Sequence, residues 1–262
     1  MAEFWRSSTV ASLEARRSAQ ENSCYRQHLH DALSIGVIDA GVSNFAGPIG
    51  GAVSLEPGDV VIIPAGQVHA CNPENGRWLY RMIHLDQEWA ASLMSPPVAA
   101  TLLDAVSVLR DPALAAAATA LTDELFLDPP PEQLQECFRR FFAVAGDAPA
   151  AHRVRSMVDP QLRARIEPVL QRLAEDEVAP RLDVLGALVG MSSYQVVRAV
   201  KRVTGLSPIA WRQNVRVLRA RQLLREGESI ADAANVLGFT DQSHFHRVFR
   251  AHVAASPGAY QG

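Results

Sequence analysis

Hydrophobic and polar residues follow a short period in the first third of the chain. Up to about residue 85, runs that alternate or are rich in β-branched residues are separated by turns containing glycine or proline. The clearest runs are Leu29 to Gly41, Ser54 to Ile63, and Trp78 to Leu85. This pattern predicts several short strands that form a small β-barrel or jelly roll. Residues 1 to 24 are only weakly patterned, and we expect a strand or two there.

From Asp86 the period lengthens to about 3.6 residues, which is typical of amphipathic helices. Four helices are predicted, over Asp86 to Met94, Val98 to Leu109, Pro112 to Leu127 and Glu132 to Val144. The last of them carries an apolar stripe of Leu134, Cys137, Phe138, Phe141 and Phe142. This stripe packs either on the barrel or against a second subunit. The small, polar stretch Gly146 to His152 is predicted to be a linker.

The C-terminal part contains an internal repeat. Its two copies run from Gly190 to Trp211 and from Gly238 to Tyr260. The repeat pairs Arg198 with Arg247, and Ser207-Pro208 with Ser256-Pro257. Each copy reads as a helix, a glycine turn, a polar N-cap and a second helix, which is the order of elements in a helix-turn-helix.

Local signals define the elements of this repeat. Gly190 and Gly238 each stand where a left-handed residue closes a helix. Ser192 or Ser193 caps the second helix of the first copy, and Thr240 or Asp241 caps that of the second. The preceding helices carry apolar stripes at helical spacing, which are Leu182, Val184, Leu185 and Leu188 in the first copy and Ile230, Ala231, Ala234, Val236 and Leu237 in the second. A first helix is predicted over Pro160 to Glu175. A long helix from Ser207-Pro208 to about Arg225 connects the copies, and its length of about 27 Å suits two successive major grooves, which lie about 34 Å apart.

The stretches R-L-D-V-L-G-A-L-V-G-M-S, S-P-I-A-W-R-Q-N-V-R-V-L-R-A-R-Q-L-L and G-F-T-D-Q-S-H-F-H-R-V-F-R, followed by S-P-G-A-Y, resemble the DNA-binding domain of AraC/XylS transcription regulators. The resemblance covers roughly Pro160 to the C-terminus. Three positions depart from the family pattern. Gly186 stands where Ala is usual, and should weaken its helix by about 1 kcal/mol. Val200 replaces Phe, and Ala254 replaces a common Gly.

Recognition helices read bases with residues near their N-termini and on their outer face. Helical spacing, together with the resemblance, selects the candidate DNA contacts, which are Tyr194, Gln195, Val197, Arg198, Lys201, Arg202, Gln242, Ser243, His246, Arg247 and Arg250. Val196, Val200, Phe245 and Phe249 lie on the opposite face and are assigned to the core. Two alternatives stay open. Arg198 and Arg247 can instead pair with acids such as Asp183 or Asp232, and Lys201, Arg202 and Arg250 can form a solvated basic face.

Charge supports nucleic-acid binding by the C-terminal half. The net charge is −3, but residues from Arg153 onward hold 16 Lys and Arg against 10 Asp and Glu, whereas the preceding residues hold 9 against 18. A basic half fused to an acidic half suggests that only the former meets DNA phosphates.

The N-terminal motifs resemble the cupin family. His28-Leu29-His30 is followed by Ser34 at the position of the motif's Glu and by Gly41 at that of its Gly. A second motif is matched by Gly58, Pro64, Gly66 and His69, whereas Asn72 comes one residue early. The block looks like the sensor barrel of arabinose-regulator-like proteins. The chain is therefore predicted to be an α+β two-domain protein. A cupin-like β-barrel with C-terminal helices precedes an all-α domain with two helix-turn-helix units joined by a long helix.

Polar groups set into an apolar barrel are typical of a small-molecule pocket. The candidate effector-binding residues are Tyr25, His28, His30, His69, Trp78, Tyr80, Arg81 and His84. Arg81 can hold a carboxylate bidentately. Trp78 and Tyr80 can equally be barrel core. Three histidines can bind a first-row metal, so a metal-dependent cupin enzyme is the alternative function. Because Ser34 replaces the usual Glu ligand, we assign no metal, no cofactor and no catalytic residue.

The bulk properties are those of an ordinary globular protein of 262 residues. There is no apolar run of 18 residues and no signal-peptide pattern, so we expect a cytoplasmic protein without a membrane partner. Cys24, Cys71 and Cys137 are expected to be reduced thiols. The expected domains are residues 1–145 and 159–262, with a linker at 146–158.

The resulting hypothesis is a sequence-specific, DNA-binding transcription regulator controlled by a small metabolite in the barrel. The family resemblance implies a homodimer held by the helices after the barrel, and an activator that contacts RNA polymerase. The sequence leaves open the effector, the target genes and whether the protein activates or represses.

Overall fold

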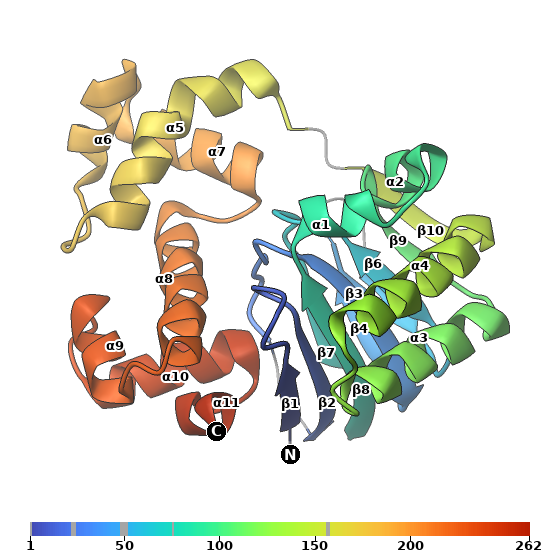
Figure 1. Cartoon of the computed structure of the whole chain (residues 1–262). Coiled ribbons are helices and arrows are strands. Elements are labelled where there is room, and N and C mark those ends of the chain that lie inside the picture. The colour runs from blue at the N-terminus through green and yellow to red at the C-terminus, as the bar shows by residue number, and fades with distance from the viewer. Residues whose placement is uncertain (1, 22–24, 48–51, 75, 156–157) are drawn as a thin grey trace. The chain divides into compact units, whose positions relative to one another are not determined.

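The computed structural model describes residues 2–21, 25–47, 52–74, 76–155 and 158–262. The chain divides into two compact units (Figure 1). The barrel unit contains Met1–Cys24 and His30–Ser156, and the helical unit contains Tyr25–Leu29 and Met157–Gly262. No helix among the described residues is long and apolar enough to cross a membrane. Cys24, one of the three expected thiols, lies outside the described residues.

The barrel unit is built on two antiparallel sheets. Its strands are β1 Ala2–Arg6, β2 Glu14–Glu21, β3 Leu33–Ala40, β4 Ser43–Ala46, β5 Ala52–Leu55, β6 Val60–Ile63, β7 Ala70–Pro73, β8 Arg77–Leu85, β9 Ala105–Leu109 and β10 Ala150–Arg155. The large sheet has the order β1-β2-β8-β3-β6-β9-β10, and the small sheet has the order β5-β4-β7. In the large sheet Ser34 on β3 lies opposite His84 on β8 and Ile63 on β6. The predicted strands are thus present, whereas β4, β9 and β10 are strands that the sequence pattern did not predict.

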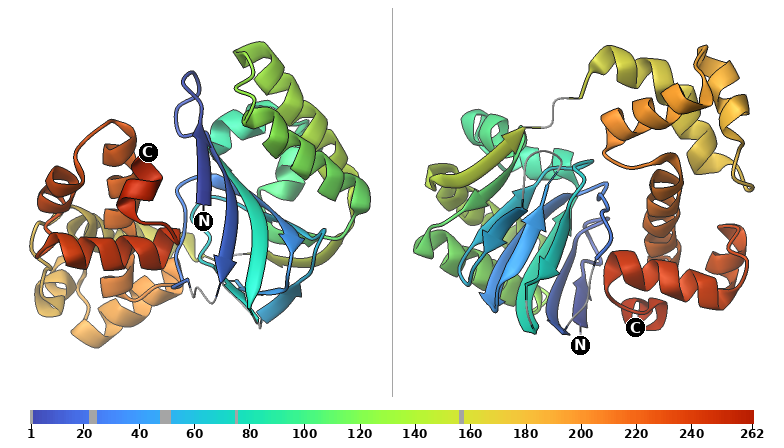
Figure 2. Two further views of the ribbon diagram at one scale, coloured as in Figure 1. Left: turned by 90° about the horizontal axis from the view of Figure 1, so that it is seen from below. Right: turned by 180° about the vertical axis from the view of Figure 1, so that it is seen from behind.

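Helices cover one face of the large sheet, as the two views of Figure 2 show. They are α1 Gln87–Ser92, α2 Pro96–Leu102, α3 Pro112–Leu125 and α4 Pro131–Asp147. Asp111 caps α3 by accepting hydrogen bonds from the amides of Ala113 and Leu114. The apolar stripe of α4 packs in the same core as Leu33 and Ile35 of β3. This stripe is therefore buried within its own unit and is not available to a second subunit.

The helix predicted over Val98 to Leu109 is wrong in its second half. Helix α2 ends at Leu102, and Ala105–Leu109 forms strand β9, in which every residue is buried. This strand pairs with β6 on one side and with β10 on the other. A short, wholly buried apolar run has no period that separates strand from helix, so only its pairing partners decide.

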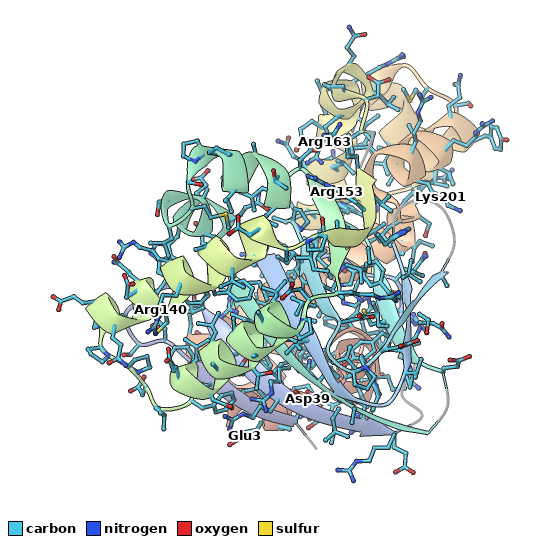
Figure 3. The ribbon with its side chains drawn as sticks, turned by 90° about the vertical axis from the view of Figure 1, so that its right-hand side faces the viewer. Glu3, Asp39, Arg140, Arg153, Arg163 and Lys201 are labelled. Atoms are coloured by element: carbon cyan, nitrogen blue, oxygen red, sulfur yellow. The ribbon has the colours of Figure 1, made fainter. Side chains whose placement is uncertain are left out.

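The linker predicted at Gly146 to His152 is also wrong. Gly146 lies in the last turns of α4, where an added Cβ would come within 2.5 Å of Val98 Cγ2. Residues Ala150–Arg155 form β10, the edge strand of the large sheet. Arg153 and Arg155 on this strand form ion pairs with Asp104 (Figure 3 labels Arg153). Small polar residues suggested a linker here, but the alternation in R-V-R carried the strand signal.

The helical unit contains seven helices among the described residues. They are α5 Pro160–Glu175, α6 Leu182–Val189, α7 Ser193–Thr204, α8 Pro208–Arg225, α9 Ile230–Val236, α10 Gln242–Val253 and α11 Pro257–Gln261. The predicted bounds of α5 and α8 are confirmed. Helices α5 to α7 gather at one end of α8, and α9 to α11 gather at the other (Figure 1). The fold thus presents two three-helix groups joined by one long helix.

Candidate DNA interface and effector site

Each copy of the repeat is a helix-turn-helix closed by a left-handed glycine. Gly190 ends α6 with φ 64°, and Gly238 follows α9 with φ 65°. Ser192 caps α7 in a capping box in which the Gln195 amide donates to the serine hydroxyl. Asp241 caps α10 by accepting from the His244 amide at 2.7 Å. These contacts choose Ser192 and Asp241 from the alternatives that the sequence left open.

Helix α7 has one apolar face and one cationic face. Val196 and Val200 are buried, as predicted. Four candidate DNA contacts lie exposed on the outer side: Tyr194, Arg198, Lys201 and Arg202. Val197 is half-buried beside them. Gln195 is exposed too, but its side-chain oxygen already accepts a 2.8 Å hydrogen bond from the Ser192 amide.

Helix α10 repeats this division. Phe245 and Phe249 are fully buried, as predicted. The candidate contacts exposed on its outer side are Gln242, Ser243, Arg247 and Arg250. His246 differs from them because it is half-buried, and its Nε2 atom is buried without a hydrogen-bond partner among the described residues. The ring packs edge-on against Phe245. Val197 on α7 and His246 on α10 are thus the two candidates that are half-buried.

The acids that could have neutralised the two arginines are engaged elsewhere. Asp183 pairs with Arg181 at 2.8 Å, and Asp232 accepts a hydrogen bond from the Ser229 hydroxyl. Neither Arg198 nor Arg247 has an ion-pair partner among the described residues. Both guanidinium groups therefore keep their charge available on exposed faces, where each can pair bidentately with a guanine or bind a phosphate.

Three histidines gather on the inner face of the barrel unit. The ring of His30 lies 4.2 Å from that of His84 and 5.2 Å from that of His69, measured between centroids. The hydroxyl of Ser34 hydrogen-bonds Nδ1 of His84 at 2.9 Å. Burial lowers the pKa of His69 to about 4, although its hydrogen bond with the Gln67 carbonyl opposes the shift. The His69 imidazole is therefore neutral at neutral pH.

Aromatic rings fill the rest of this inner face. Trp78 and Tyr80 stack with their centroids 4.2 Å apart, and Phe45 stacks on His69 at 6.1 Å. They leave a cavity of about 10 Å³, which Trp78, Tyr80 and the neighbouring β3 residues line. Such a volume holds about one water molecule.

The predicted effector residues belong to both units. His30, His69, Trp78, Tyr80 and His84 lie together on the inner face. Arg81 points to the other face of β8, where it pairs with Asp39 and Asp123. Tyr25 and His28 belong to the helical unit, and their rings lie 5.9 Å apart. The sequence analysis missed Phe45, although the alternation in S-N-F-A carried its signal.

Few residues of the barrel unit could act as metal ligands at the inner face. Neutral imidazoles are good ligands for first-row metals, and His30 and His69 can each offer a nitrogen. Ser34, at the position of the acidic cupin ligand, is a hydroxyl already hydrogen-bonded to His84. His30 and His69 are thus the inner-face residues of the barrel unit that could hold a metal ion.

Comparison with known families agrees with both halves of this description. Residues 11–143 match the model described as an AraC-like ligand binding domain, and residues 185–262 match that of a helix-turn-helix domain. The chain belongs to the AraC/XylS family of transcription regulators. It is thus a DNA-binding transcription regulator with a ligand-binding domain, and the predicted two-domain fold is confirmed.

Individual AraC/XylS relatives and related structures support the assignment. The chain is 26% identical over 249 residues to the uncharacterized HTH-type transcriptional regulator YbfI of Bacillus subtilis, covering 88% of this chain and 85% of YbfI. It is 36% identical over 97 residues to the activator RhaS of Klebsiella pneumoniae, covering 36% of this chain and 34% of RhaS. A match to the Escherichia coli transcriptional activator and DNA repair enzyme Ada, at 38% identity, covers 29% of this chain and 22% of Ada. The structure of apo ToxT K231A from Vibrio cholerae aligns over 98% of both chains with a TM-score of 0.61 and 12% identity, which shows a shared fold.

Proposed function

We propose that this AraC/XylS protein activates transcription at promoters bound by α7 and α10, under the control of a small metabolite held on the inner face of the barrel. DNA binding is supported by the exposed cationic faces of α7 and α10, which lie at the two ends of α8. The proposed contacts are Tyr194, Gln195, Val197, Arg198, Lys201, Arg202, Gln242, Ser243, His246, Arg247 and Arg250. Arg198 in α7 and Arg247 in α10 can select bases. The cationic residues that follow them in each helix can add phosphate contacts.

The proposed effector contacts are His30, His69, His84, Trp78 and Tyr80. A cluster of imidazoles beside aromatic rings offers hydrogen bonds and an apolar wall to a polar metabolite. A sugar fits this chemistry, and so do amino acids and other small metabolites. The proposed control requires a ligand that binds one arrangement of the barrel more tightly than another. Such a difference in affinity between two arrangements is what permits control.

The proposal includes a homodimer in the cytoplasm that contacts RNA polymerase. The apolar stripe of α4 is buried in its own unit, so a dimer must use the outer surfaces of the helices instead. Sedimentation of the full chain over a range of concentrations tests this part. A monomer at every concentration, with and without DNA, would remove dimerisation from the proposal.

The decisive experiment selects DNA from a random duplex library with the full-length protein. The selected sequence is then footprinted at about 50 mM and about 200 mM salt, because affinity carried by several phosphate contacts falls steeply over this range. We expect protection of two adjacent major grooves that weakens with salt. Failure to enrich any sequence at either salt concentration, with and without added metabolites, would overturn the proposal.

Arg247→Ala is the matching variant. Removing one base-reading arginine should lower affinity for the selected sequence by about 10-fold to 100-fold while leaving the fold unchanged. Arg163→Ala is the control, because Arg163 is exposed on α5 and pairs with Glu167 on the same helix. Equal affinity of the Arg247 variant and the wild type would show that α10 does not read this sequence.

A further inference from the structure

Five residues from the N-terminal half of the sequence belong to the helical unit. They are Tyr25–Leu29, which we call the strap. In sequence the strap lies between β2 and β3 of the barrel unit. His28 and Leu29 are buried, although neither lies in a regular helix or strand. Arg26 and Gln27, which precede them, are exposed.

The first anchor of the strap is Asn214, in the middle of α8. Its side chain is 2% exposed and binds both backbone groups of one residue. The Leu29 amide donates to Oδ1 of Asn214 at 3.0 Å, and Nδ2 of Asn214 donates to the Leu29 carbonyl at 3.1 Å. A buried carboxamide without partners is costly. Asn214 is therefore suited to this position only when the strap is in place.

The second anchor is on α10. The Arg26 amide donates to the carbonyl of Ala251 at 3.1 Å. Ala251 lies in the last turn of α10, where helix carbonyls have no partner within the helix. The strap thus satisfies one end of α10 while Asn214 holds it to α8. These two anchors connect the long helix to the second recognition helix.

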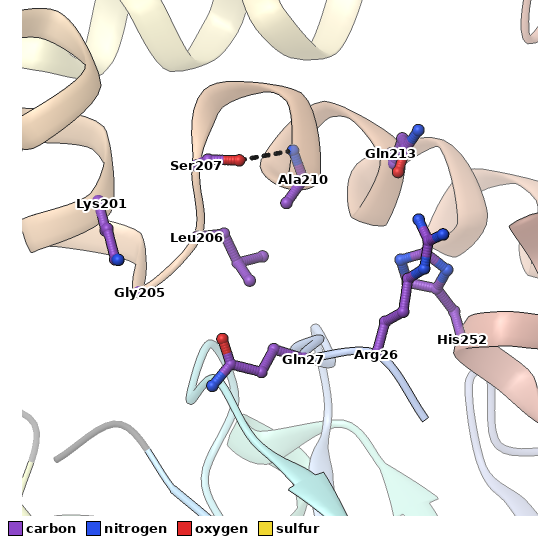
Figure 4. A pocket seen from close by; sticks show the side chains of 9 residues that line it. All are labelled: Arg26, Gln27, Lys201, Gly205, Leu206, Ser207, Ala210, Gln213 and His252. Carbon is purple, nitrogen blue, oxygen red and sulfur yellow. Dashed lines mark hydrogen bonds between the residues drawn. The ribbon is translucent and has the colours of Figure 1, made fainter. Parts of the chain in front are cut away.

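Beside the anchors the strap borders a cavity of about 330 Å³, shown in Figure 4. Arg26 and Gln27 form one wall, and the turn from Gly205 to Ser207 lies across from them. His252 of α10 also lines the cavity. Its pKa is lowered by burial and, to a smaller extent, by the charge of Arg26. Because this space is open, discrete hydrogen bonds rather than continuous packing hold the strap here.

We propose that Asn214 is a positioning residue for DNA recognition: it holds the strap, and through the strap it sets α10 relative to α8. This inference rests on the proposed function for its DNA part, but the positioning itself does not need DNA. Releasing the strap should loosen the end of α10 and leave α7 unchanged.

Hydrogen exchange measured by mass spectrometry on the full-length protein tests the positioning. In Asn214→Ala, amides in residues 25–29 and in the C-terminal half of α10 should exchange about tenfold faster or more, because two hydrogen bonds are lost. Amides in α7 should be unchanged. The control is Gln222→Ala, an exposed α8 residue whose side chain bonds only Glu226 among the described contacts. Unchanged exchange in the strap of the Asn214 variant would overturn the proposal.

A second variant covers the case in which Asn214→Ala does not fold. Arg26→Pro removes the amide that binds Ala251 without altering α8 or α10. Faster exchange at the end of α10 in this variant supports the strap, whereas wild-type exchange there contradicts it.

Footprinting on the sequence selected by the wild type then tests the consequence for DNA. Asn214→Ala should lose protection over the α10 groove while keeping it over the α7 groove, and Gln222→Ala should keep both. Equal weakening at both grooves would refute a positioning role specific to α10. If the wild type selects no sequence at all, the proposed function fails. The hydrogen-exchange experiment still shows whether Asn214 holds the strap and the end of α10.

Discussion

In α7 the guanidinium carbon of Arg198 lies 5.6 Å from the centroid of the Tyr194 ring, one helical turn earlier. The Nη1 atom of Arg198 also donates a 3.4 Å hydrogen bond to the tyrosine hydroxyl. Tyr194 is 68% exposed, so this contact stands on the surface of the recognition helix. It orients an otherwise mobile cation before DNA is bound.

We expect Tyr194→Ala to weaken binding of the selected sequence by about threefold or more, because an exposed cation–π contact contributes about 0.5–1 kcal/mol. Tyr194→Phe keeps the ring and should lose less. Affinities are measured by fluorescence anisotropy with labelled duplex. Equal losses in the two variants would show that the hydroxyl, rather than the ring, is what matters.

Ala254→Gly should stabilise the helical unit by about 0.5–1 kcal/mol. Ala254 ends α10 with φ 52°, a left-handed conformation that glycine adopts without strain. Chemical denaturation of the full chain measures the change. Ala255→Gly is the control, because Ala255 is buried next to it and has no left-handed φ. That control should be less stable than the wild type, and a less stable Ala254→Gly would contradict the prediction.

Gly186→Ala should destabilise the protein by about 1–3 kcal/mol despite the higher helix propensity of alanine. A Cβ at Gly186 would lie 2.2 Å from the carbonyl oxygen of Met191, in the turn before α7. The expected weakening of α6 by this glycine is therefore outweighed by the close approach that it permits. Gly258→Ala is the control, because its Cβ would meet only Ile230 at 3.8 Å. The comparison is made by thermal unfolding, and a Gly186 variant as stable as the control would refute the prediction.

Acid should destabilise the barrel unit through His69. The folded-state pKa of about 4 lies below the ordinary value of 6.5, so the unfolded chain binds the proton more tightly. Stability is complete above pH 6.5 and falls as the pH decreases toward 4, by on the order of 3 kcal/mol. Burial lowers the pKa of His252 as well, so acid should also destabilise the helical unit.

Urea denaturation of the wild type and of His69→Gln at several pH values within this window measures the contribution of His69. The variant should show a shallower loss of stability on acidification. Parallel curves for the two proteins would mean that other groups account for the acid sensitivity.

Local signals predicted the helical unit well. Proline at the start of α5 and α8, the left-handed glycines and the N-caps each fix an element within a few residues of themselves. Three residues of the predicted apolar stripes, Val184, Leu188 and Val236, are 45%, 47% and 63% exposed. Short helices bury only a narrow stripe, so apolar content alone did not identify the inner face.

The wrong predictions in the barrel unit have two causes. One is strand pairing between residues distant in sequence, and the other is the alternation of side chains between the two faces of a strand. Strand β9 has no local signal that separates it from a helix, and its partners β6 and β10 are distant in sequence. Arg81 could have been excluded, because alternation places Trp78, Tyr80 and His84 on one face of β8 and Arg81 on the other. The strap could not have been predicted, since nothing in Tyr25–Leu29 indicates a partner on α8.

Strand β10 has a practical consequence for dissecting the protein. It covers β9, whose five residues are all buried, and it carries Arg153 and Arg155 at the outer edge of the large sheet. A barrel fragment cut at residue 145 would expose an apolar strand edge, which is a template for aggregation. A fragment that extends through Arg155 keeps a charged edge strand that discourages such pairing. Expression of the isolated barrel unit should therefore depend on residues 146–155, although their sequence resembles that of a linker.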